Sequence, residues 1–182
     1  MASSLSRRRF LGTTTGMAAG LFTAPNLLLR GQNAAGKRLN IAVIGANGKG
    51  QSDTQAVTLA HNIVALVDVD QNRLDEAAAK RSKHHLDSGE QAPAAPKLYK
   101  DFRKMFDEMA KDIDAVIIST PDHTHYAAAM WAIKHGKHVC VQKPLCNYIN
   151  EVRTLHKAAT DAKVVTQMGN QGRTMEGQRL AK

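Results

Sequence analysis

The 182-residue chain has only two cysteines, Cys140 and Cys146, and their spacing fits neither a zinc knuckle nor a Cys-x-x-Cys redox site. We therefore expect two buried, inert thiols. The sequence also has no internal repeat and no long low-complexity tract. Once an N-terminal segment described below is set aside, the remaining length suits one domain with a sizeable core.

Acidic residues are absent from the first 38 positions, so the positive charges there face no acids. Six units of the chain's formal net charge of +9 come from this segment, at Arg7, Arg8, Arg9, Arg30, Lys37 and Arg38. The high isoelectric point therefore belongs mainly to the N-terminus. It gives little reason to expect a nucleic-acid partner.

The N-terminal segment resembles an export signal. Ser-Arg-Arg-Arg-Phe-Leu at residues 6–11 matches a twin-arginine signal, and the apolar residues 12–29 follow as its hydrophobic region. Thr, Gly and Pro interrupt that region too often for a convincing membrane span. We expect residues 1–36 to be a twin-arginine signal peptide and linker that directs the protein to the periplasm, without stable membrane insertion. A retained anchor or a disordered basic tail is the alternative.

From residue 37 onward, apolar strand-like runs alternate with helix-like segments, which is the pattern of a doubly wound parallel α/β sheet. The expected strands are residues 39–44, 62–67, 97–99, 115–119, 138–142 and 164–168. The expected helices are residues 51–60, 71–85, 125–134 and 150–162, together with one that Asp101 caps and Phe102 begins. We treat residues 37–182 as this domain.

A cluster of glycines, Gly-Ala-Asn-Gly-Lys-Gly at residues 45–50, follows the first expected strand. Gly45 suits a tight turn, and the helix after the turn offers free amides and a positive dipole end to a diphosphate. In the Gly-x-Gly-x-x-Gly pattern, Asn47 replaces the middle glycine, with Gly48 beside it and Gly50 in the last position. Asn tolerates left-handed backbone geometry, so it can replace glycine in such a turn. The turn therefore predicts nucleotide binding.

Two alternatives to this interpretation remain. The same letters approach a P-loop, but Gln51 stands where the phosphate-binding lysine belongs and Lys49 comes two residues early. An ordinary strand-to-helix turn is the other alternative.

Asp68 ends the second apolar run and supports the dinucleotide interpretation. It follows Gly45 by 23 residues, close to the spacing of about 20 for an acid that binds an adenosine ribose. A carboxylate there favours NAD, because it would repel the 2′-phosphate of NADP. Arg73 lies near enough to weaken this preference, so NADP is also possible.

Lys143 is the candidate catalytic residue, because ligands of such a sheet bind beyond the carboxyl ends of its strands. It directly follows an apolar strand, and Pro144 restricts the backbone there. Beside a positively charged nicotinamide ring an amine gives up its proton more readily. Lys143 could therefore exchange a proton with a substrate hydroxyl as hydride moves. The alternative is a solvated lysine after a strand.

Asp122, His123 and His125 follow the fourth expected strand and raise the possibility of a metal site. Two histidines in a loop or a first helical turn more often form hydrogen bonds. We expect them beside the nicotinamide or the substrate, and we expect no metal.

Taken in order, these motifs resemble the N-terminal half of the Gfo/Idh/MocA oxidoreductases, which include glucose-fructose oxidoreductase and inositol 2-dehydrogenase. The motifs are Ala-Val-Ile-Gly-Ala-Asn-Gly-Lys-Gly at 42–50, Val-Asp at 67–68, Thr-Pro-Asp-His-Thr-His at 120–125, Gly-Lys-His-Val-Cys-Val-Gln-Lys-Pro-Leu at 136–145 and Gln-Met-Gly-Asn-Gln-Gly-Arg at 167–173. The resemblance covers residue 38 to about residue 180.

The resemblance implies a Rossmann domain that binds NAD or NADP, with Lys143 at the catalytic lysine of a Glu-Lys-Pro motif. Gln142 replaces the usual Glu, as in some exported members, and Arg173 falls at an arginine that members often have after the sixth strand. The implied cofactor-binding residues are Gly45, Asn47, Gly48 and Gly50 at the pyrophosphate, Asp68 at the adenosine ribose, and Thr120, Pro121, His125 and Gln142 toward the nicotinamide.

Members of this family continue into a second α/β domain that closes the substrate pocket, mediates oligomerisation and supplies a further catalytic His or Asp. The resemblance implies that this C-terminal domain is missing from the chain and that full-length relatives are homo-oligomers. We therefore expect the chain to bind a dinucleotide but to turn over poorly or not at all.

The expected function is an exported NAD(P)-dependent oxidoreductase acting on a hydroxyl carbon of a sugar, polyol or cyclitol. Its partner would be a small carbohydrate-like molecule. Two alternatives stay open: a redox glycosidase that oxidises its sugar transiently with NAD, and a non-catalytic dinucleotide-binding module.

Overall fold

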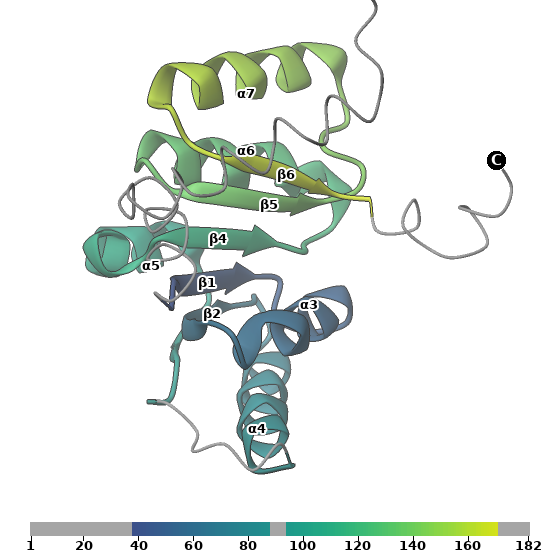
Figure 1. The fold of residues 1–182 in the computed structure, drawn as a ribbon. Coiled ribbons are helices and arrows are strands. Elements are labelled where there is room, and N and C mark those ends of the chain that lie inside the picture. The colour runs from purple at the N-terminus through teal and green to yellow at the C-terminus, as the bar shows by residue number, and fades with distance from the viewer. Residues whose placement is uncertain (1–37, 88–93, 171–182) are drawn as a thin grey trace, which may run out of the picture. The chain divides into compact units, whose positions relative to one another are not determined.

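The computed structural model describes residues 38–87 and 94–170, in which six parallel strands form one sheet (Figure 1). The expected export signal at residues 1–36 and the arginine at position 173 lie outside the described residues. Within the described ranges, no helix has both the length and the apolar character needed to cross a membrane.

The strands agree closely with the sequence-based expectation. They are β1 (Asn40–Ile44), β2 (Asn62–Val67), β3 (Lys97–Tyr99), β4 (Ala115–Ile118), β5 (His138–Gln142) and β6 (Thr166–Gly169). The bounds of β2, β3 and β5 are those predicted, whereas β1, β4 and β6 are shifted by one or two residues. Short apolar runs bounded by polar or glycine residues are thus sufficient to locate every strand.

The strand order is β3-β2-β1-β4-β5-β6, the order of a doubly wound Rossmann sheet, so the predicted fold class is confirmed. β1 lies in the middle, with β2 paired along one edge and β4 along the other. The chain therefore builds outward from β1 first in one direction and then in the other. In such sheets the crevice between β1 and β4 is where ligands bind.

Helices connect the strands and cover the sheet. They are α3 (Lys49–Thr58), α4 (Gln71–Asp87), α5 (Phe102–Met109) with the short 3₁₀ turn η1 (Ala110–Asp112), α6 (Asp122–Lys134) and α7 (Ile149–Ala162). Three of them begin earlier than expected, α7 by a single residue. α3 starts directly after Gly48, and α6 starts after Pro121, whose carbonyl accepts a hydrogen bond from the Thr124 hydroxyl.

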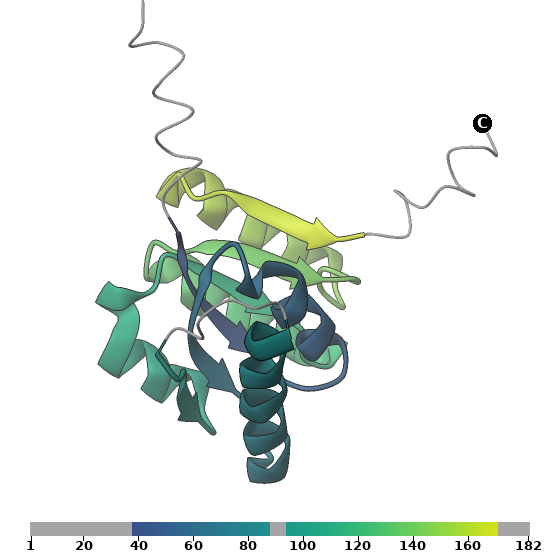
Figure 2. The same ribbon diagram turned by 60° about the horizontal axis from the view of Figure 1, so that its bottom comes forward.

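Alternate residues of β1, β4 and β5 enter two separate hydrophobic clusters, one on each face of the sheet. Ala42 and Ile44 of β1 pack with apolar residues of α5, α6 and α7. Ile41 and Val43 pack on the other face, with residues of α4. Figures 1 and 2 show α6 and α7 on one side and α3 and α4 on the other. Burial on both faces explains why the strands are nearly continuous apolar runs.

Local caps fix where several helices begin and end. The Asp101 carboxylate accepts from the backbone N–H of Arg103 and begins α5, as predicted. Gly136, with φ 69°, follows the end of α6, also as predicted. Asp101 thus sets where the segment after β3 ends, and Gly136 sets where the segment that leads to β5 begins.

The register of the sheet aligns the ends of its strands. Ile44 of β1 lies opposite Val67 of β2 on one side and Ile118 of β4 on the other. Ile118 lies opposite Val141 of β5 in turn. The residue that follows each of these four positions is therefore delivered to the same edge of the sheet.

Candidate functional site

The glycine turn after β1 packs against the backbone that follows β4. Gly45 has φ 85°, and a Cβ there would lie 2.7 Å from the carbonyl carbon and oxygen of Ser119. A Cβ on Gly50 would lie 1.7 Å from the Gly45 carbonyl oxygen. Neither position has room for a side chain, so the turn is compact because both residues are glycine.

Gly48 differs from these two glycines, because its missing side chain leaves open space. Its φ is 58°, and a Cβ built on it would meet nothing within 4 Å. The Asn47 side chain braces the turn: its Oδ1 accepts from the Gly48 N–H at 2.7 Å, and its Nδ2 donates to Glu76 of α4 at 2.8 Å. The open face of the turn lies at the first residues of α3, and the N-terminus of a helix attracts an anion.

Asp68 follows β2, and its carboxylate is fixed by the backbone. Oδ2 accepts from the Ala46 N–H and Oδ1 from the Asp70 N–H, both at 3.2 Å. The first of these bonds joins Asp68 to the glycine turn. The acid is thus held at a fixed position relative to the turn, which is what binding of a ribose by this carboxylate would require.

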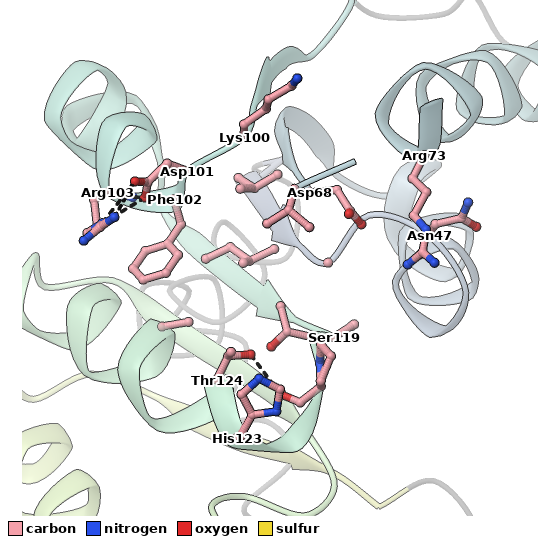
Figure 3. A pocket seen from close by; sticks show the side chains of 17 residues that line it. Asn47, Asp68, Arg73, Lys100, Asp101, Phe102, Arg103, Ser119, His123 and Thr124 are labelled. Carbon is pink, nitrogen blue, oxygen red and sulfur yellow. Dashed lines mark hydrogen bonds and ion pairs between the residues drawn. The ribbon is translucent and has the colours of Figure 1, made fainter. Parts of the chain in front are cut away.

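A cavity of about 520 Å³ opens beside Asp68. The glycine turn, the segments after β2, β3 and β4, and the first turn of α6 form its walls. Figure 3 shows Phe102 and Arg73 on opposite sides of Asp68. The cavity therefore combines an aromatic ring with charged groups of both signs, which suits a nucleoside.

A second cavity, also of about 520 Å³, lies beyond the ends of β4 and β5. Its lining residues are Lys49, Ser119, Thr120, Asp122, Gln142, Lys143, Gly169 and Asn170. Ser119 and Thr120 line both cavities. The Thr120 hydroxyl is buried and finds no hydrogen-bond partner among the described residues. A buried hydroxyl without a partner at this boundary fits a polar ligand that passes from one cavity to the other.

Lys143 is exposed and lines the second cavity, directly after the last residue of β5. No hydrogen bond or ion pair of its ammonium group is formed with another described residue. The following peptide bond, to Pro144, is cis. The amine is thus available to a molecule in the cavity.

His125 lies behind this wall and lines neither of the two cavities. The ring is 1% exposed, with Nδ1 2.6 Å from the Pro144 carbonyl oxygen and Nε2 2.8 Å from the Thr120 carbonyl oxygen. We expected it to line the path to the nicotinamide. The structure places it instead between the backbones of two segments that do border the cavities, while Pro121 itself lines the first cavity.

The neighbours of His125 in α6 divide between the two cavities. His123 and Thr124 line the first, and Asp122 lines the second. In the part of the chain that the structure describes, no three His, Cys, Asp or Glu side chains gather in a way that could hold a metal ion. The first turn of α6 therefore borders both cavities.

Both thiols are free and half-buried, and neither lines either of the two cavities. Burial raises the pKa of the Cys146 thiol to about 11 and also raises that of Cys140. Both groups therefore stay protonated near neutral pH, which suits inert packing residues.

Sequence reasoning missed two parts of the site. Residues 100–103 line the first cavity and directly follow β3. Because ligands of such a sheet bind beyond the carboxyl ends of its strands, the position of these residues after a short, weakly predicted strand was the signal for them. Asp53 of α3 accepts a hydrogen bond from the Gln142 side chain at 2.8 Å. These two residues are 89 positions apart, and no local pattern connects them.

Comparison with known proteins agrees with this geometry. The family model GFO_IDH_MocA, described as an oxidoreductase family with an NAD-binding Rossmann fold, matches residues 39–170. The chain is also similar to myo-inositol 2-dehydrogenase from Lactobacillus plantarum, a solved structure, with a TM-score of 0.66 and 25% identity. The match covers 80% of this chain and 40% of that one.

Two relatives are similar in sequence. A glycosyl hydrolase family 109 protein from Shewanella pealeana is 30% identical over 165 residues, covering 81% of this chain and 35% of its own length. Levoglucosan dehydrogenase from Pseudarthrobacter phenanthrenivorans is 35% identical over 65 residues, covering 36% of this chain and 16% of its own. The chain thus spans about a third or less of these relatives.

The open face at Gly48 can be tested with a matched pair of variants. Gly48→Ala and Gly136→Ala both place a Cβ in open space at a positive φ, so both should lower stability in urea unfolding, Gly48→Ala by more because its ψ of −116° lies outside the left-handed helical region. Only Gly48→Ala puts a methyl group where a pyrophosphate would approach. It should weaken NAD binding about tenfold in calorimetric titration, and equal NAD affinities of the two variants would contradict this assignment.

Proposed function

Because the chain belongs to the Gfo/Idh/MocA oxidoreductase family and carries its NAD-binding Rossmann domain, we propose that the protein transfers hydride between NAD and a hydroxyl carbon of a sugar, polyol or cyclitol. One observation carries this proposal: the open turn at Gly48, the fixed carboxylate of Asp68 and the amine of Lys143 all follow strands that end at one edge of the sheet. The relatives named for levoglucosan and myo-inositol support the substrate class.

The two cavities support one orientation of the dinucleotide. Asp68 would accept hydrogen bonds from the adenosine ribose in the first cavity, with the Phe102 ring nearby. The amides at the start of α3 would bind the pyrophosphate across Gly48. Thr120 would then offer its buried hydroxyl where the ligand enters the second cavity.

Lys143 is the proposed proton-transfer residue of the second cavity. Bound NAD supplies the hydride acceptor there. The amine of Lys143 takes the proton of the substrate hydroxyl when the alcohol is oxidised, and returns it in the reverse direction. Gln142 is 9% exposed and hydrogen-bonded, so the backbone at the start of the Lys143 segment is firmly held.

The charges around the first cavity support a preference for NAD over NADP. Asp68 has both carboxylate oxygens held by backbone N–H groups, so it cannot turn away from a 2′-phosphate. At an effective dielectric of 20, two unit charges 4 Å apart interact by about 4 kcal/mol, which is an upper guide for this open site. Arg73 opposes the preference, but its side chain is 61% exposed and its Nε atom pairs with Asp70 at 3.7 Å.

Two variants should shift this preference in opposite directions. Asp68→Ser removes the repelling charge and should lower the ratio of NAD to NADP affinity about tenfold or more. Arg73→Ala removes the attracting charge and should raise the same ratio, by a smaller factor because the side chain is exposed. Titration of both coenzymes into each variant measures the ratio. An unchanged ratio in Asp68→Ser would refute the role given to that carboxylate.

The role of Lys143 is tested in any form of the protein that turns over a sugar or polyol. Lys143→Met should lower kcat by about 10²- to 10⁴-fold, because the proton acceptor is lost, and NAD affinity should stay within about twofold. Lys134→Met, an exposed lysine near the end of α6, is the control and should leave both unchanged. Full turnover by the Lys143 variant would mean that another group moves the proton.

A redox glycosidase is the second candidate, because the family 109 glycosyl hydrolase relative matches 81% of the chain. In that reaction NAD oxidises the sugar and is restored within one cycle. Glycoside cleavage with bound cofactor that is never consumed would select it, whereas accumulation of free NADH would select the dehydrogenase.

Export by the twin-arginine route to the periplasm is also part of the proposal. It rests on the arginine motif at residues 6–11. Cell fractionation tests it, since a protein found wholly in the cytoplasm would contradict export.

A further inference from the structure

Asp53 of α3 connects three separate parts of the site. Its Oδ2 accepts from the Ser119 hydroxyl and from the Gln142 side-chain amide, each at 2.8 Å. Its Oδ1 pairs with the ammonium of Lys49, one helical turn earlier. The partners come from the start of α3, the segment after β4 and the last position of β5. One carboxylate therefore joins the helix of the glycine turn to the two strands on the far side of the crevice.

All three partners of Asp53 line the second cavity, together with Lys143. Asp53 itself is not among the lining residues, and its side chain is 15% exposed. The carboxylate therefore lies behind the wall that would face a ligand. Any effect it has on that ligand passes through the side chains it holds.

Gln142 has little freedom to make other contacts. Its amide nitrogen donates to Asp53, and on its other side it packs against Gly169 of β6. A Cβ on Gly169 would lie 2.6 Å from the Gln142 Oε1 atom. The Gln142 side chain is thus confined between an acceptor on α3 and a glycine on the neighbouring strand, directly before Lys143.

The chemistry of this contact requires one acid and one amide. An ionised carboxylate only accepts hydrogen bonds, and Ser119, Gln142 and Lys49 each supply a donor. A glutamate at position 142 would set two carboxylates against each other at hydrogen-bond distance, where both cannot stay ionised without cost. An asparagine at position 53 would weaken the acceptor and remove the charge that holds Lys49.

We propose that Asp53 is a positioning residue for the lysine end of the site. Its hydrogen bond fixes Gln142 relative to α3, the helix that begins at the glycine turn. Because Lys143 directly follows Gln142, the backbone that carries Lys143 is fixed as well. The effect on NAD rests on the proposed function, because Gln142 and Ser119 border the cavity assigned to the nicotinamide. The contact between residues 53 and 142 does not depend on that function.

A swap of the two side chains tests the proposal in the 182-residue chain. Asp53→Asn and Gln142→Glu should each weaken NAD binding about tenfold in calorimetric titration. The double variant restores one acid and one amide with the direction of the bond reversed. It should bind NAD within about threefold of the wild type, because the donor–acceptor pair is complete again. A purely local role of Asp53 in its helix predicts no such recovery.

The control is a carboxylate with the same helical spacing away from the site. Lys157 and Asp161 of α7 pair at 2.7 Å, four residues apart and exposed. Asp161→Asn removes an ion pair of the same kind and should change NAD affinity less than twofold. A loss of binding in this control equal to that in Asp53→Asn would overturn the assignment.

Thermal unfolding without cofactor separates this proposal from the proposed function. The double variant should unfold at a higher temperature than either single variant, whether or not NAD binds. If it is no more stable than the more stable of the two single variants, or if Asp53→Asn binds NAD as the wild type does, the proposal is wrong. Should Asp53→Asn fail to fold, Ser119→Ala removes one donor with no change of charge, and unaltered NAD affinity in that variant would also count against the proposal.

A wild-type chain that fails to bind NAD would overturn the proposed function and leave the unfolding comparison valid.

Discussion

The parallel pairing of β1 with its two neighbours is the constraint on which the site depends. Because Ile44 lies opposite both Val67 and Ile118, the next residue of each strand arrives at the same edge of the sheet. Those next residues are the first glycine of the turn, the acid that we propose to bind the ribose, and a serine that borders both cavities. A shift of one residue in either pairing would separate them and would turn every buried side chain of the strand toward the opposite face.

Small residues and fixed polar groups have different roles at that edge of the sheet. Gly45 and Gly50 bring backbone against backbone, so the turn stays close to β4. Gly48 keeps the outer face open, and Asp68 is held by the Ala46 N–H of the turn and by the Asp70 N–H. The site is therefore largely preformed, which reduces the ordering that a ligand has to impose.

The fold could be predicted from the sequence because its signals are local. Apolar runs marked all six strands, and caps such as Asp101 and Gly136 marked helix ends. The family was also predicted correctly, from motifs that follow the strands. The early start of α6 was missed because the histidines were interpreted separately from Pro121, which can precede a helix without losing a hydrogen bond.

The contacts across the crevice could not be predicted in the same way. The burial of His125 between two carbonyl groups depends on how the segments after β4 and β5 meet. The link from Asp53 to Gln142 depends on α3 lying over the ends of strands that come much later in the chain. Such contacts are set by tertiary packing, and the residue types alone do not specify them.

The large sequence separation between Asp53 and its partners has a consequence for how the chain folds. Asp53 meets Ser119 and Gln142 across 66 and 89 residues, so the second cavity closes only after β4 and β5 have joined the sheet. Pairings between distant segments form late and slowly. A chain in which β4 and β5 have not yet joined the sheet therefore lacks the far wall of the crevice. By mass action, bound coenzyme would stabilise only those molecules in which both sides of the crevice are in place.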